Sequence, residues 1–382
     1  MDSLGASGVV WDDARTVFSI AQPSHASMMT GRYPSHLGTV SNTATLQAHF
    51  SPLAQELSAE GYGCGAFINT WILDEESGLN HGFATFVRAE REALTKPRIV
   101  EKEGKLFTVY RVNNPSAVRT VKLATSWLAE TEKPFFLWVH LMDPHLDYSP
   151  PDSILSYLGF TDIDPKYGNG EFLSKPHKRG LSFSMTAVEK MRRLYAGEVA
   201  YVDRALCQLF SGIREQHRNT VVVLVSDHGE NICDDGTYVG HAYSLDESVV
   251  RIPLIMSGPG IPAGIRNRHA MDLTQLKSIL RGVLYREMGG SELPDLFSQE
   301  ERVLICKDLK GRTAAYYRGW CVIRDKDTNW NRITRKGQCD STTAIARIDS
   351  TLFELERSSI PEFKRMLNMD ETAKLAALGY AE

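Results

Sequence analysis

The sequence predicts an α/β protein: a doubly wound, mostly parallel sheet flanked by helices, with a small C-terminal α+β subdomain. Short apolar runs alternate along the chain with longer segments of helical periodicity. Strands that alternate with helices are typical of βαβ units around a parallel sheet. The chain has 382 residues, 42% of them hydrophobic, so it can bury a large core without disulfides or metals.

The predicted strands are apolar runs of the length of a buried strand, rich in β-branched or aromatic residues. They are Cys64–Ile68, Phe135–His140, Thr220–Val225, Pro253–Ser257 and Arg302–Cys306. Such runs favour strands covered by helices on both faces.

Helical periodicity is strongest in Val188–Ile213, where apolar residues recur every three or four positions. This pattern predicts a helix with one face packed on the sheet. Ala117–Glu130 and Leu273–Leu284 show it more weakly. The segment Leu146–Leu181 is rich in Pro, Asp, Gly and Ser, and we expect a long surface insertion of the kind that faces the substrate or is mobile.

The pattern changes after about residue 300. Arg312–Tyr317 and Trp320–Ile323 flank Arg318-Gly319, which predicts an antiparallel hairpin, and a short helix is predicted around Glu371–Leu378. We therefore predict a main domain over residues 1–300 and a small subdomain over residues 301–382.

Composition excludes several classes of function. The formal net charge is −4, which gives no argument for nucleic-acid binding. No apolar run is long enough for a membrane helix, and residues 1–5 do not resemble a secretion signal, so the chain as written is expected to be cytoplasmic. The six cysteines are scattered without a CxxC pair, which favours reduced thiols over disulfides.

The end of the strand Thr220–Val225 carries a candidate metal site. Ser226-Asp227-His228-Gly229-Glu230 follows that strand directly, and ligands of doubly wound sheets bind beyond the carboxyl ends of the strands. A carboxylate next to an imidazole suits a divalent cation. Asp227 could instead cap a helix, with His228 an ordinary polar loop residue. His241, in a later loop, could contact an anionic substrate or simply face solvent.

Two further segments carry candidate groups. The strand Phe135–His140 leads into Asp143-Pro144-His145, where prolines would hold a catalytic group rigidly, although a plain polar loop explains these residues equally well. Ala21–Pro34 predicts a short helix that ends at Gly31, with Ser24 as a plausible N-cap. Such a helix could bind an anion at its N-terminus or be purely structural.

Together these segments resemble the sulfatase family of the alkaline-phosphatase-like superfamily. Ala21–Pro34 is similar to the family pattern C/S-x-P-S-R-x-x-x-x-T-G-R-Y-P, with His in the arginine position as in the P-S-H-A-S branch. The other matching segments are Pro134–Pro151, Ser226–Glu230, Gly240-His241, Ile252–Gly260 and Ala377–Tyr380, in the family's order.

The resemblance implies hydrolysis of sulfate esters at a divalent-metal site. It implies that Asp227 and His228 bind the metal, usually Ca²⁺, together with an acidic pair from a first strand. His145 and His241 would contact the sulfate oxygens or the leaving group. His25 would support the nucleophile in place of the usual arginine. The implied partner is a small anionic sulfate ester.

Two departures from the family pattern bear on activity. Sulfatases usually begin with a strand that ends in acidic metal ligands, whereas residues 1–4 already match the helix that follows it. The resemblance therefore implies an N-terminally truncated domain, with two exposed strand edges and about half of the metal ligands. The nucleophile position is Ala21. Its methyl group cannot become formylglycine or attack sulfur. Ser19 or Ser24, or water activated by a complete metal site, would have to replace it.

Three functions remain open at this point. The first is a sulfatase-like hydrolase whose activity is weak or lost. The second is a phosphate- or phosphonate-ester hydrolase of the same superfamily, which needs a hydroxyl nucleophile such as Ser19. The third is a catalytically dead homologue that binds anions without turnover, which Ala21 favours.

Overall fold

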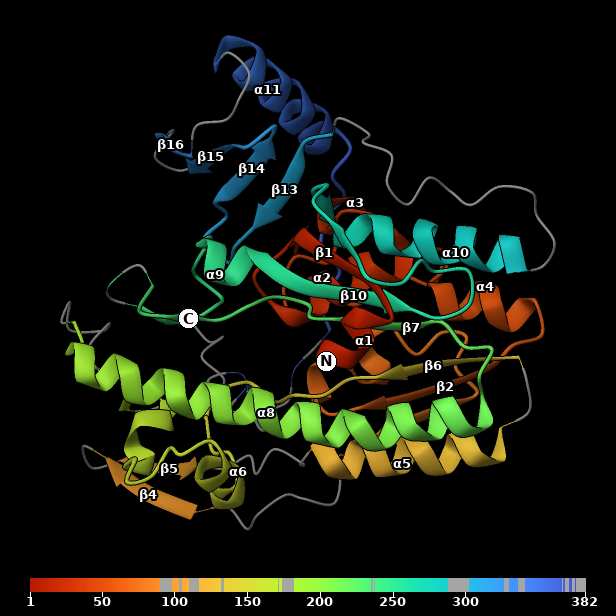
Figure 1. Ribbon diagram of the computed structural model, residues 1–382. Helices are drawn as coiled ribbons and strands as arrows, with labels where there is room; N and C mark the ends of the chain where they lie inside the picture. Colours follow the sequence, from red (N-terminus) through yellow and green to blue (C-terminus); the bar gives the residue numbers. More distant parts are fainter. Residues whose placement is uncertain are drawn as a thin grey trace.

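The computed structural model describes most of the chain as layers of helices around two sheets with mostly parallel strands, with a four-stranded antiparallel sheet to one side (Figure 1). The described residues are 1–89, 98–102, 105–109, 117–131, 134–170, 172–173, 182–234, 236, 238–287, 302–325, 330–335, 341–365, 367, 371–372 and 375. None of the described helices combines the length and the apolar character that a membrane crossing requires.

The larger sheet has the strand order β11-β1-β10-β7, with β12 also paired to β1. Its strands are β1 (Gly8–Arg15), β7 (Val222–Val225), β10 (Arg251–Ser257), β11 (Ile265–Asn267) and β12 (Met271–Asp272). Strand β10 runs antiparallel to both β1 and β7, whereas β1 is parallel to β11 and β12. Strands β1 and β7 therefore run in the same direction.

A second sheet is wholly parallel, in the order β3-β2-β6. Its strands are β2 (Gly63–Ile68), β3 (Thr85–Arg88) and β6 (Phe135–Val139). The α/β class with a mostly parallel, helix-flanked sheet is thus confirmed, and β2, β6, β7 and β10 match the predicted strands to within a few residues.

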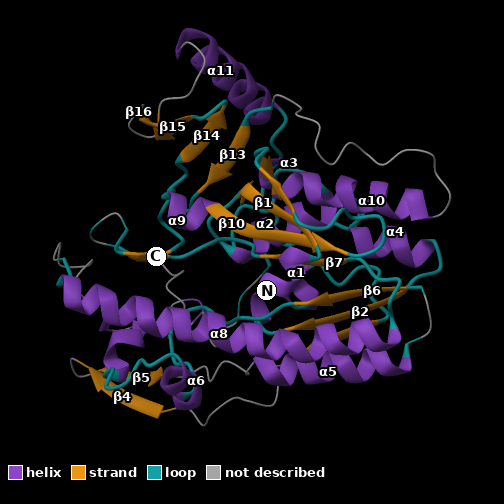
Figure 2. Cartoon of the chain, viewed as in Figure 1, coloured by secondary structure: helices purple, strands orange, loops and turns teal. Residues whose placement is uncertain are grey.

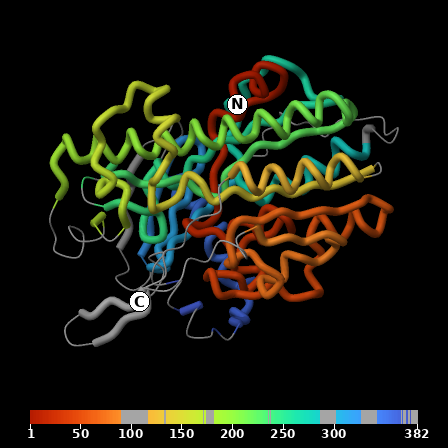
Figure 3. Tube along the Cα trace, turned by 90° about the horizontal axis from the view of Figure 1, so that it is seen from below, coloured from red at the N-terminus to blue at the C-terminus, as the bar shows by residue number. Residues whose placement is uncertain are grey.

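Helices cover both faces of these sheets. On one face α5 (Ala117–Glu130) and α8 (Met185–Gln216) lie side by side (Figure 3) and pack against Phe135, Leu137 and Val139 of β6. On the other face α2 (Ala21–Thr30) and α10 (Leu276–Glu287) pack against β1, β7 and β10. The Ser184 hydroxyl caps α8 by accepting a hydrogen bond from the Ala187 N–H.

The C-terminal sheet is antiparallel and separate from the other two (Figure 2). It consists of β13 (Leu304–Lys307), β14 (Thr313–Tyr317), β15 (Trp320–Asp325) and β16 (Trp330–Arg335). Helix α11 (Ser341–Arg357), which the sequence analysis did not predict, buries Ala344, Ile348 and Leu352 against it. The predicted hairpin is β14–β15. Most of the predicted helix around Glu371–Leu378, and the segment Ala377–Tyr380, lie outside the described residues.

The remaining elements are short. They are α1 (Asp2–Ala6), α3 (Pro34–Leu37), α4 (Leu53–Ala59), α6 (Asp152–Tyr157), α9 (Glu247–Val250), β4 (Arg98–Lys102), β5 (Lys105–Val109), β8 (Asn231–Ile232), β9 (Val239–Gly240), η1 (Trp71–Leu73), η2 (Glu75–Ser77), η4 (Pro165–Gly168) and η5 (Leu273–Gln275). Helices α6 and η4 lie in the predicted insertion and pack against α8, so its described part is not a bare loop. No disulfide joins the described cysteines.

A cavity of about 710 Å³ lies between the two sheets. It is lined by β6 and β7 from the sheets and by residues of α2, α8 and α10 from the helix layers. Packed protein interiors hold few voids larger than a water molecule, so a space of this size in the middle of an α/β fold is a distinctive feature of the molecule. The predicted site residues lie at one end of it.

Candidate functional site

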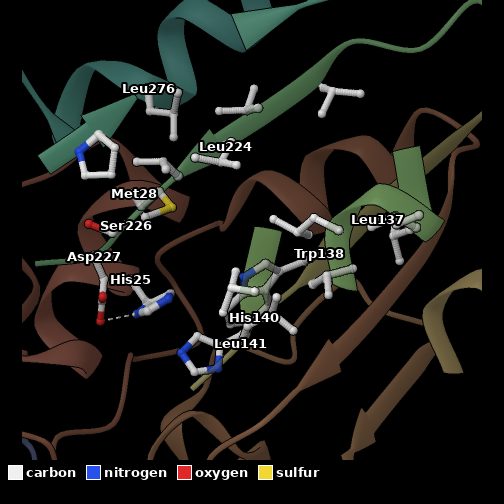
Figure 4. Close-up of a pocket in the computed structure, with 18 of the residues that line it drawn as sticks. His25, Met28, Leu137, Trp138, His140, Leu141, Leu224, Ser226, Asp227 and Leu276 are labelled. Atoms are coloured by element: carbon white, nitrogen blue, oxygen red, sulfur yellow. Dashed lines mark ion pairs between the residues drawn. The ribbon is translucent and has the colours of Figure 1, made fainter. Parts of the chain in front are cut away.

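The site forms where three elements end or begin together (Figure 4). Strand β6 leads into His140, β7 leads into Ser226 and Asp227, and α2 begins at Ala21. These residues, with His25 on α2, line the same end of the cavity. The carboxyl ends of β6 and β7 therefore deliver their polar residues to one place, as expected for parallel strands.

Helix α2 is held rigidly because all ten of its residues are buried. It starts after the extended residue Ile20 and ends at Gly31, whose φ of 75° is the left-handed conformation that favours glycine. The prediction that Ser24 is its N-cap is wrong: Ser24 lies inside the helix. The Ser24 hydroxyl donates to the Phe18 carbonyl at 2.8 Å and contacts the Thr16 hydroxyl at 3.0 Å, which ties the helix to the chain before it.

Asp227 lies among imidazoles. Its Oδ2 is 3.5 Å from Nδ1 of His25 and 3.5 Å from Nε2 of His228. Burial alone would raise the pKa of Asp227, but the neighbouring His228 and His25 outweigh burial and lower the pKa below the ordinary aspartate value. Burial, and then the neighbouring His25, lower the pKa of His140 to about 3. The carboxylate is therefore ionised at neutral pH.

Three further groups continue the site from Asp227. The ring of His241 stacks on that of His228 with centroids 4.0 Å apart, and the ring of His145 meets His241 edge-on at 5.1 Å. Nδ1 of His241 lies 3.0 Å from Oε1 of the buried Glu230. The loops after β6 and β7 thus meet the loop that carries His241 in one continuous cluster.

Backbone carbonyls set the tautomers of three of these histidines. Nδ1 of His25 lies 2.9 Å from the Ala21 carbonyl, Nδ1 of His145 lies 2.7 Å from the Leu146 carbonyl, and Nδ1 of His228 lies 2.9 Å from the Gly229 carbonyl. A carbonyl only accepts hydrogen bonds, so each Nδ1 carries a proton. Burial and the neighbouring His241 lower the pKa of His145 to about 4. His145 is therefore neutral at pH 7 when no ligand is bound.

Two buried glutamates support this cluster, and the sequence analysis missed Glu198. Oε1 of Glu198, on α8, accepts a hydrogen bond from the Ser149 N–H at 2.7 Å. Burial, and then the nearby Asp143, raise the pKa of Glu198 to about 8. Burial raises the pKa of Glu230 and His145 partly offsets this effect, which leaves the pKa at about 7. Glu198 could have been identified from the sequence, because it is an acidic residue within the apolar stripe of the predicted helix.

The hydroxyls of Ser19 and Ser24, the two candidate replacements for a nucleophile at Ala21, are both engaged in hydrogen bonds. Ala21 lines the cavity. Ser19 is fully buried, and its hydroxyl donates to the Ala242 carbonyl at 2.9 Å. Ser24 is fully buried and bonded to Phe18 as described above. Both hydroxyls are committed to backbone carbonyls, so their geometry does not support the replacement considered from the sequence.

Metal ligands are few in the described part of the chain. There, no group of three or more His, Cys, Asp and Glu side chains converges to hold a metal ion. Asp227 and His228 provide one carboxylate and one imidazole. Calcium takes six to eight oxygen ligands, so the described donors do not fit a complete calcium site.

Comparison with known proteins decides the family. The family model described as Sulfatase matches residues 2–280, which is most of the chain. The chain belongs to the sulfatase family. This family generally uses a divalent metal, usually Ca²⁺.

Two proteins of Formosa agariphila are among the relatives of this sulfatase-family chain. A sulfatase is 26% identical over 307 residues, covering 69% of this chain and 59% of the relative. An ulvan-active sulfatase is 26% identical over 287 residues, covering 68% of this chain and 51% of the relative. The chain therefore spans between half and three fifths of the length of these two curated relatives.

Solved structures of the superfamily share the fold. One, a complex with its substrate D-glucosamine-2-N,6-O-disulfate, has a TM-score of 0.69 at 14% identity, covering 94% of this chain and 92% of that one. A phosphonate monoester hydrolase from Silicibacter pomeroyi has a TM-score of 0.67 at 15% identity, covering 93% and 89%. At such identities the likeness concerns the fold alone.

The structure brings together all the site residues that the sequence analysis selected. Ala21, His25, His145, Asp227 and His228 line one cavity, and His241 contacts His145 and His228. Their roles in catalysis, substrate binding and metal binding stay predictions. The predicted site is thus assembled around the methyl group of Ala21.

Proposed function

We propose that this chain is a sulfatase-like hydrolase of sulfate esters whose turnover is limited by Ala21. The observation that carries the proposal is the convergence of the β6 and β7 ends, the first turn of α2 and the His241 loop on one pocket. Transfer of a sulfuryl group needs a nucleophile, positive charge around the equatorial oxygens and a proton for the leaving oxygen. This cluster can supply the positive charge and the proton, but not the nucleophile.

The histidines supply the remaining roles. We assign His25 to the nucleophile position beside Ala21, and His145 and His241 to the sulfate oxygens and the leaving group. A neutral imidazole attracts an anion weakly, but a bound dianion favours the imidazolium form and raises its pKa. Binding of the substrate is therefore coupled to proton uptake, and a protonated histidine can then give its proton to the leaving alkoxide.

This coupling predicts that sulfate binds more tightly at low pH. His145 is neutral in the empty site at pH 7, because its pKa is lowered to about 4. Consider the pH range between the pKa of the histidine in the free protein and its pKa in the sulfate complex. In that range, each proton taken up on binding raises the sulfate affinity by up to about tenfold for every unit by which the pH is lowered. We expect isothermal titration calorimetry to give a sulfate affinity at least about tenfold higher at pH 5.5 than at pH 8.

The matched variants are His145→Ala, which should abolish this pH dependence, and the exposed His49→Ala, which should preserve it. A sulfate affinity that is independent of pH in the native chain, or unchanged in His145→Ala, contradicts the assignment of His145.

For the metal, we assign Asp227 and His228 as two ligands of a divalent cation, Ca²⁺ by family. When bound, such a cation would add positive charge next to the sulfate oxygens. Two ligands give weak binding, so we expect a small rise of the melting temperature at millimolar Ca²⁺ and none in Asp227→Asn. Differential scanning fluorimetry measures both. A calcium response that is unchanged in Asp227→Asn removes Asp227 from the ligand set.

For the substrate, we propose a sulfated sugar or an aryl sulfate. The support is the names of two similar proteins, which act on or bind sulfated carbohydrates. The phosphonate-ester alternative needs a hydroxyl nucleophile, and the hydrogen bonds of Ser19 and Ser24 do not favour it. Sulfate binding without any measurable hydrolysis would instead support the binding-only homologue.

A further inference from the structure

The cavity between the sheets is bordered by two strand edges. Among the described residues, β6 pairs only with β2 on one side, and β7 pairs only with β10 on one side. Both strands line the cavity along their whole length. Their side chains are mostly half-buried, although their sequences, Phe-Phe-Leu-Trp-Val and Val-Val-Leu-Val, are those of central strands.

The hydrogen-bond pattern shows which backbone groups of β6 face the cavity. The His140 N–H donates to the Phe67 carbonyl of β2 at 2.9 Å. In a parallel ladder alternate residues bond to opposite neighbours, so Phe136 and Trp138 bond to β2 as His140 does. The N–H and C=O groups of Leu137 and Val139 therefore point to the cavity.

The same argument applies to β7. The Ser226 N–H donates to the carbonyl of Pro253 in β10 at 3.4 Å. Alternation along β7 then directs the backbone groups of Val223 and Val225 away from β10, toward the cavity. Two rows of backbone donors and acceptors thus border the cavity from both sides, and such rows are templates for a further strand.

The direction of that strand is determined by the site. Strands β6 and β7 both end at the histidine cluster, so they run in the same direction. A strand between them would be parallel to both. Strand β6 has five residues, or about 17 Å at 3.3 Å per residue, so five residues span the cavity.

Both faces of such a strand would meet apolar side chains. On one side the cavity is lined by Met28 of α2 and by Leu276 and Leu280 of α10. On the other side it is lined by residues of α8, among them Leu206 and Leu209. A strand alternates its side chains between its two faces, so both sets must be apolar.

We propose that this cavity binds one apolar peptide strand of about five residues, inserted parallel to β6 and β7. The inserted strand joins the two sheets into one, because it receives hydrogen bonds from both edges. This inference does not depend on the chemistry proposed for the histidine cluster, and its test needs no sulfate ester.

The probe is a synthetic peptide with five alternating Val and Leu residues after two lysines that keep it soluble. Fluorescence anisotropy of a labelled form measures binding to the native chain. We expect saturable binding with one site per chain and a higher melting temperature. Residue-resolved hydrogen exchange should show new protection at the amides of Leu137, Val139, Val223 and Val225, and little change at Trp138.

Backbone N-methylation of the peptide separates insertion from other modes of binding, since it removes donors and leaves the side chains unchanged. In a strand with two neighbours, odd residues bond to one neighbour and even residues to the other. Methylation of either set should therefore weaken binding by about 100-fold, as expected for the loss of two or more hydrogen bonds.

Three outcomes overturn the proposal. If methylation weakens binding at only the odd or only the even residues, the peptide pairs with only one of the strands β6 and β7. A peptide that keeps its affinity when both sets are methylated occupies the cavity by apolar contact only. Absence of binding at the solubility limit of the peptide shows that the cavity does not accept a strand.

Discussion

Ala21→Ser is expected to introduce hydrolysis of 4-nitrophenyl phosphate at least about 100-fold above the native chain. The substitution places a hydroxyl at the first residue of α2, where Ala21 lines the cavity. Loss of a nucleophile typically costs an enzyme several orders of magnitude in rate, so restoring one to an otherwise assembled site should produce a large gain. Phosphate esters are the suitable substrate because a serine can attack phosphorus directly. Release of 4-nitrophenol in the presence of Ca²⁺ measures the rate.

The control is Ala21→Val, which adds bulk without a hydroxyl and should stay at the level of the native chain. Sulfate affinity should be similar in all three proteins if the pocket is intact. If Ala21→Ser binds sulfate normally and still hydrolyses nothing, the pocket is an anion-binding site alone, and the hydrolase proposal is wrong.

Glu198→Gln is expected to stabilise the protein at alkaline pH by on the order of 4 kcal/mol. The pKa of Glu198 is raised to about 8 in the folded protein, against about 4.5 in the unfolded chain. Between these values the folded state binds a proton that the unfolded state lacks, so stability falls as pH rises from about 4.5 to 8. Glutamine mimics the protonated acid and keeps an oxygen to accept from the Ser149 N–H. Urea unfolding at pH 5 and pH 9 measures the difference.

Glu189→Gln is the matched control, because Glu189 lies on the same helix but is exposed and paired with Arg193. It should leave the pH dependence of stability unchanged. If Glu198→Gln and the native chain have the same free energy of unfolding at pH 9, ionisation of Glu198 does not destabilise the folded protein, and the prediction is wrong.

Much of the framework could be predicted because burial leaves a strong pattern in the sequence. The apolar run Phe135–His140 and the periodic segment Val188–Ile213 correspond to β6 and α8 in the structure. The polar residues that follow β6 and β7 could be located for the same reason, since strand ends are visible and parallel strands deliver their ends to one edge.

Strand β1 was missed because two acids interrupt its apolar run. The pairing of β1 with β10 shifts register between Trp11 and Ala14, so Asp12 and Asp13 occupy a bulge within a continuous strand. At its start, a Cβ on Gly8 would lie 2.1 Å from the Met256 carbonyl oxygen, so this close pairing requires glycine. Neither feature produces a periodic signal.

Contacts between different segments explain the other misses. Ser24 is a residue type typical of helix N-caps, but its hydroxyl bonds to Phe18 and Thr16, six and eight positions earlier in the chain. Glu198 is a single acid on an otherwise amphipathic helix, and its hydrogen bond to Ser149 joins segments that are 49 positions apart. Sequence patterns describe local preference, whereas these interactions depend on tertiary packing.

The most direct test of the account is a crystal structure of the native chain soaked with selenate, a sulfate analogue whose selenium scatters anomalously. We expect one strong anomalous peak at the end of the cavity, within hydrogen-bond distance of His145 or His241 and next to Ala21. A fully occupied selenate elsewhere, with no peak among these histidines, would contradict the claim that the loops after β6 and β7 and the start of α2 form an oxyanion site.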